Sequence, residues 1–132
     1  MTASMAQAAT MRAAFDRIEE SYEFMLAYAA QGRKREVEEG GGESQIRQYL
    51  KRFGAALADL DAAVGEGFGS DDSRAFADRF RADIAVVRSV LALLLAQPSV
   101  SSDMVDNTNG LIALRALLTD VFFADQVVLP PR

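Results

Sequence analysis

Helical repeats of large apolar residues occupy four separate stretches of this chain, and they constrain its fold more than any other feature. Within each stretch these residues recur every three or four positions, which places them along one face of an α-helix. The stripe of the second stretch consists of Ile46, Leu50, Phe53, Leu57, Leu60 and Val64. No stretch alternates strictly between apolar and polar residues, as a half-buried strand would. The sequence therefore predicts an all-α protein whose helices bury their stripes against one another.

Serine, glycine and proline residues mark the ends of the predicted helices. Ser44 and Ser70 precede the second and third helices, where a hydroxyl accepts a hydrogen bond from a free backbone amide. Gly32 and Pro98 end the first and third helices, because glycine suits a helix C-terminus and proline restricts the residue before it. The predicted helices span about residues 3–31, 44–64, 70–97 and 101–125. Their short connections predict an antiparallel up-down-up-down four-helix bundle.

The chain of 132 residues suits a single helical domain with one core. Residues 33–43 include three consecutive glycines and are expected to form a flexible loop, and residues 127–132 a short extended tail. The longest strongly apolar run, residues 84–96, is shorter than the roughly 20 residues that cross a membrane. The first residues also lack the basic start and apolar run of a signal peptide, so we expect a cytoplasmic protein without a membrane span.

The absence of histidine and cysteine from the sequence excludes most routes to catalysis. These residues supply the commonest general base, the thiol nucleophile and the usual soft metal ligands. Glutamates on the first helix lack the histidines that accompany them in di-iron bundles. We therefore expect a protein that is not an enzyme, with no catalytic residues, no cofactor and no metal site. A net charge of −5 also disfavours binding to nucleic acid.

The third and fourth stretches carry a broader apolar face than a peripheral bundle helix needs. The excess either lies deeper within the monomer or meets a second protein, and we favour the second alternative. The chosen interface residues are Leu93, Leu114, Leu117, Phe122 and Phe123. We therefore expect a helical interaction module, such as an adaptor, assembly factor or regulator, that forms a homodimer or binds a partner protein.

The alternative function is a carrier or sensor for a small molecule or lipid, with a pocket between the helices. Residues 106–110 (DNTNG) are unusual within a helix, and they indicate either a kinked or late helix start or a polar notch for a ligand. Two arginines within apolar stretches are either solvated or contact an anion. The possible ligand or anion contacts are Tyr22, Tyr49, Arg88, Asn107, Asn109 and Arg115.

Overall fold

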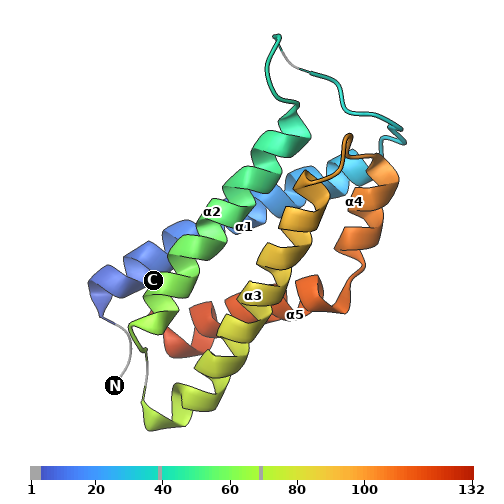
Figure 1. The fold of residues 1–132 in the computed structure, drawn as a ribbon. Helices are drawn as coiled ribbons and strands as arrows, with labels where there is room; N and C mark the ends of the chain where they lie inside the picture. The colour runs from blue at the N-terminus through green and yellow to red at the C-terminus, as the bar shows by residue number, and fades with distance from the viewer. Residues whose placement is uncertain (1–3, 39, 69) are drawn as a thin grey trace.

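The protein is all-α, as the periodicity predicts. The computed structural model describes residues 4–38, 40–68 and 70–132, and these residues form five α-helices and no strand (Figure 1). The helices are α1 (Met5–Ala29), α2 (Gln45–Gly65), α3 (Arg74–Leu95), α4 (Ser102–Asn109) and α5 (Ile112–Phe123). A 3-10 turn, η1 (Asp71–Ser73), precedes α3, and a π-helical turn, η2 (Ala124–Val128), follows α5.

Serine caps set the starts of several helices. The Ser44 hydroxyl accepts a hydrogen bond from the Arg47 amide at 3.4 Å and so caps α2, as predicted. Ser101 caps α4 in the same way. Ser70 lies before η1, so the third helix begins with a 3-10 turn. Three positions of the predicted elements, Ala3, Glu39 and Gly69, lie outside the described residues.

The core lies among all five helices. α1 packs against α2 and α4, α2 packs against α3, and α3 packs against α5. The entire apolar stripe of α2 is buried, which confirms the periodicity from which that helix was predicted. The largest fully buried side chains of the other helices include Met11, Phe15, Ile18, Met25, Phe80, Ile84 and Leu114.

The prediction of one continuous fourth helix is wrong, because the helical backbone is interrupted at Gly110 and Leu111, between α4 and α5. Leu111 has an extended backbone with ψ of 136°, and α5 then runs across α3 in a different direction from α4 (Figure 1). The buried Asn109 side chain donates a hydrogen bond to the Met25 carbonyl oxygen at 3.2 Å, which anchors the end of α4 to α1. Asparagine and glycine are poor helix formers, so the break falls at the weakest point of the stretch.

A buried glutamate ties the segment between α1 and α2 to the rest of the molecule. The Glu36 carboxylate accepts hydrogen bonds from Ser44 Oγ at 2.6 Å, Arg47 Nε at 2.7 Å and the Val100 amide at 2.6 Å. Burial raises the pKa of Glu36, but these hydrogen bonds outweigh it and hold that pKa below its usual value. We call Glu36, Ser44, Arg47 and Val100 the Glu36 cluster. It joins the loop before α2 to the loop before α4.

The C-terminal residues pack against α1 rather than extending into solvent from residue 127. Helical backbone continues to Val128, so the extended tail begins at Leu129. Arg12 on α1 binds Asp125 Oδ1 at 2.8 Å and the Pro130 carbonyl oxygen at 2.6 Å. The C-terminus therefore lies at the same end of the molecule as the start of α1 (Figure 1).

Candidate functional site

Exposed apolar side chains concentrate in the C-terminal part of the chain. Seven of the ten large apolar residues that are exposed in the described ranges come from α3 or from the segment 111–128. Because α3 and α5 pack against each other, their exposed residues lie on neighbouring helices. We define the α3–α5 surface by the five of these residues that lie within α3 or α5 themselves, which are Val86, Leu93, Ile112, Phe122 and Phe123.

The spacing of residues along this surface suits contact with another helix. Val86 and Leu93 are seven residues apart and share one face of α3. On α5, four residues recur at intervals of four, three and four, namely Ile112, Ala116, Thr119 and Phe123. This spacing is that of paired helices, and the two small central residues let another backbone approach closely.

The structure divides the five predicted interface residues between the surface and the core. Leu93, Phe122 and Phe123 are exposed, with 65% of Leu93 accessible to solvent. Leu114 and Leu117 are buried in the monomer, with exposures of 2% and 0%, so choosing them as interface residues was wrong. Helix α5 is apolar on two faces, and the face that carries these two leucines already packs into the core.

Two aspartates meet where α3 packs against α5. Asp83 is 6% exposed, and Arg79 Nε lies 3.1 Å from its Oδ1. Asp120 Oδ2 is buried and has no hydrogen-bond partner among the described residues. Burial, and then the neighbouring Asp83 carboxylate, raise the pKa of Asp120 to about 7, while Arg79 acts in the opposite direction. Near neutral pH the Asp120 carboxyl therefore carries a proton part of the time.

The aspartate pair borders the α3–α5 surface. Val86 follows Asp83 by three residues, and Phe123 follows Asp120 by three residues, so each lies one turn from a carboxylate. The Phe123 ring also packs edge-to-face on Phe76 of α3, with 5.0 Å between centroids. The proton and the apolar surface are thus located at the same helix-helix contact.

Sequence reasoning missed Asp83, although its position carried a signal. It lies three residues after Phe80 and four before Val87, in line with the buried stripe of α3. Asp120 similarly follows buried Leu117 by three residues. A carboxylate within an apolar stripe indicates a buried partner, but the sequence alone does not say which residue on another helix provides it.

The predicted ligand contacts do not come together in one place. The Tyr49 ring stacks on Phe24 with 4.2 Å between centroids. Asn109 Nδ2 donates its hydrogen bond to the Met25 carbonyl oxygen, while the buried Asn109 Oδ1 has no partner among the described residues. Tyr22 is partly buried against the core. Arg88, Asn107 and Arg115 are exposed.

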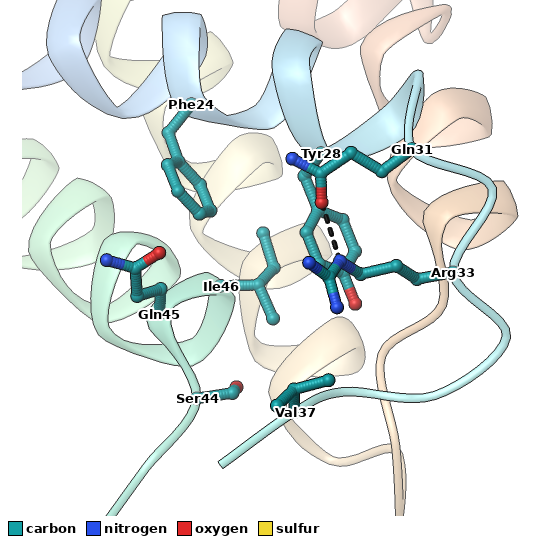
Figure 2. A pocket seen from close by; sticks show the side chains of 8 residues that line it. All are labelled: Phe24, Tyr28, Gln31, Arg33, Val37, Ser44, Gln45 and Ile46. Atoms are coloured by element: carbon teal, nitrogen blue, oxygen red, sulfur yellow. Dashed lines mark hydrogen bonds between the residues drawn. The ribbon is translucent and has the colours of Figure 1, made fainter. Parts of the chain in front are cut away.

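A small pocket lies beside the end of α1 and the start of α2 (Figure 2). It has a volume of about 90 Å³, well below the roughly 300–1,000 Å³ of typical ligand sites. In Figure 2, Arg33 reaches toward Gln31, and its Nε donates a hydrogen bond to Gln31 Oε1 at 2.6 Å. The lining residues are Phe24, Tyr28, Gln31, Arg33, Val37, Ser44, Gln45 and Ile46. Neither Tyr22 nor Tyr49 lines it, so the carrier function stays a prediction.

The described residues contain no group of three or more carboxylates placed to hold a metal ion. In the same residues, no helix is both long enough and apolar enough to cross a membrane.

Comparison with known proteins gives no relative from which a role could be transferred. No family model, no curated protein and no solved structure matches this chain. Its function is therefore inferred from the α3–α5 surface and the aspartate pair.

Proposed function

We propose that this protein is a non-enzymatic interaction module and that two copies associate through the α3–α5 surface. The observation that carries this proposal is the concentration of exposed large apolar residues on α3 and α5. Large apolar side chains exposed on two neighbouring helices favour contact with another protein. The cytoplasmic location that the sequence favours is part of the same proposal.

The size of the surface supports a second copy as its occupant. The exposed parts of its five side chains amount to roughly 600 Å², taking about 200 Å² for each large side chain. A standard interface buries about 800 Å² on each partner, and a little over half of that area is apolar. Each copy therefore offers about the apolar area that such an interface needs.

The shape of the surface supports the same occupant. A two-fold contact requires a surface that complements itself, and helices with exposed residues at four-three-four spacing meet that requirement. We infer that α4 and α5 together take the place of the fourth helix of an up-down bundle. The break between them gives α5 its own direction and leaves one of its apolar faces exposed.

Replacing Leu93 with glutamate tests this proposal. We expect the substitution to weaken self-association by about 30-fold or more, because it places an unpaired carboxylate in an apolar contact. Sedimentation equilibrium over micromolar to millimolar concentrations measures the dissociation constant. Circular dichroism checks that the variant keeps its helix content, which we expect because Leu93 is mostly exposed.

Leu26 on α1 provides the matched control. It is 47% exposed and does not belong to the α3–α5 surface. Leu26→Glu adds the same charge and is expected to leave self-association unchanged. A wild-type protein that remains monomeric at millimolar concentration, or an equal effect of the two substitutions, would show that the proposal is wrong.

A further inference from the structure

We propose that Asp83 and Asp120 form a pH-sensitive contact that holds α5 against α3 when Asp120 is protonated and weakens when that proton is lost. This inference concerns packing within one chain, so it does not depend on the association proposed above. Three observations support it: the contact between α3 and α5, the buried Asp120 Oδ2 without a hydrogen-bond partner among the described residues, and the position of α5 between the interruption at Gly110 and the π-helical turn.

The contact contains more negative charge than its surroundings compensate. Two carboxylates come together from different helices, and Arg79 is the cation that binds one of them, Asp83. Asp120 Oδ2 is buried without a donor in the described part of the chain. A proton on the Asp120 carboxyl supplies the missing donor and removes one of the two charges.

The other charged groups near Asp120 do not replace that proton. On η2, the Asp125 carboxylate is itself bound by Arg12 and Arg132. On α4, the aspartates are exposed. The elements packed on α5 carry further charged groups, and outside Arg79 and Asp83 those of α3 are exposed. The full set is Arg74, Asp78, Arg79, Arg81, Asp83 and Arg88 of α3, Asp103 and Asp106 of α4, and Asp125 of η2.

The position of α5 in the fold lets it detach from α3 while the other helices stay packed. It spans 12 residues, begins after the break at Gly110 and ends at the π-helical turn. The proton can therefore act on α5 without disrupting the pairing of α1 with α2. Because α5 carries three members of the α3–α5 surface, the same proton would also influence association, and that consequence alone rests on the proposed function.

The direction of the pH effect follows from proton linkage. When α5 detaches, Asp120 meets water and its pKa returns toward the ordinary value of 3.8, from about 7 in the packed state. Detachment therefore becomes easier as pH rises from about 4 to about 7, and it levels off above 7 because both states are then ionised. Below pH 4 both states are protonated, and the effect of pH disappears.

Hydrogen exchange of the backbone amides tests this inference. After correction for the intrinsic exchange rate, we expect the protection of α5 amides to fall at least tenfold between pH 5 and pH 7.5 and then to level off. Amides of α2 serve as the internal reference. We expect Asp120→Asn to abolish the pH dependence of α5, because the amide cannot ionise and can donate a hydrogen bond.

Asp78→Asn is the control substitution, since Asp78 is an exposed carboxylate on the same helix as Asp83. It is expected to retain the wild-type dependence on pH. Constant protection of wild-type α5 across this range, or an unchanged dependence in Asp120→Asn, would overturn the inference. If Asp120→Asn does not fold, the pKa of Asp120 is measured in the wild type from the chemical shift of its side-chain carboxyl carbon. A measured pKa near the ordinary value of 3.8 would overturn the inference.

Discussion

Glu36→Ala is expected to lower the free energy of unfolding by about 3–5 kcal/mol, the usual effect of removing one partner from a buried ion pair. The Glu36 and Arg47 side chains are only 10% and 20% exposed. Removal of the carboxylate leaves the Arg47 charge without its counterion and takes away the acceptor of the Ser44 hydroxyl and the Val100 amide. Urea denaturation at pH 7, followed by circular dichroism, measures the loss.

Glu38→Ala is the matched control for this substitution. Glu38 is an exposed glutamate two residues away, and its loss is expected to change the free energy of unfolding by less than about 0.5 kcal/mol. Because the pKa of Glu36 is lowered in the folded state, its contribution is present above pH 4.5 and is lost as pH falls through the folded value. The difference in the free energy of unfolding between the wild type and Glu36→Ala should therefore decrease as the pH falls below 4.5. Equal stability of the two alanine variants at pH 7 would contradict a structural role for the Glu36 cluster.

Leu117→Ala is expected to destabilise the protein by about 3–5 kcal/mol. Leu117 has an exposure of 0% and belongs to the apolar core, so truncation removes buried methyl groups and leaves a cavity. The exposed Leu93 makes the same substitution a matched comparison, since Leu93→Ala is expected to change stability by less than about 0.5 kcal/mol.

Thermal and urea denaturation of the two leucine variants distinguishes core from surface. The sequence predicts that both residues contact a partner. If both substitutions lower the free energy of unfolding by a similar, small amount, that prediction is supported and burial of Leu117 in the monomer is contradicted. A large loss of stability for Leu117→Ala, independent of protein concentration, is the result that burial within one chain requires.

The helices could be predicted from the sequence because their signals are local. The stripe from Ile46 to Val64 and the cap at Ser44 depend only on residues within a few turns of one another. The apolar repeats of the third stretch predict α3 in the same way. In each of these helices, the face that carries the apolar repeat is the face that is buried in the structure.

The other features depend on which helices meet, and periodicity does not contain that information. Leu114 and Leu93 lie in similar apolar repeats of the sequence. The change of direction between α4 and α5 buries Leu114, whereas Leu93 stays exposed. Asp120 acquires its unusual environment only because α3 brings Asp83 to it. Glu36 and Val100, which are 64 residues apart, are joined by a contact between two loops. Contacts between residues so far apart in the sequence decide which of the predicted interface residues are exposed and which are buried in the core.

The bonds that Arg12 makes with the C-terminal residues also have a consequence for protein synthesis. Its partners, Asp125 and the Pro130 carbonyl, are separated from it by more than a hundred residues. While the chain is still emerging from the ribosome, α1 and α2 can pair, but Arg12 must remain hydrated until those residues have left the exit tunnel. The native contacts of α1 are therefore completed only after the segment 125–130 has emerged from the ribosome, when α5 and η2 are free to dock.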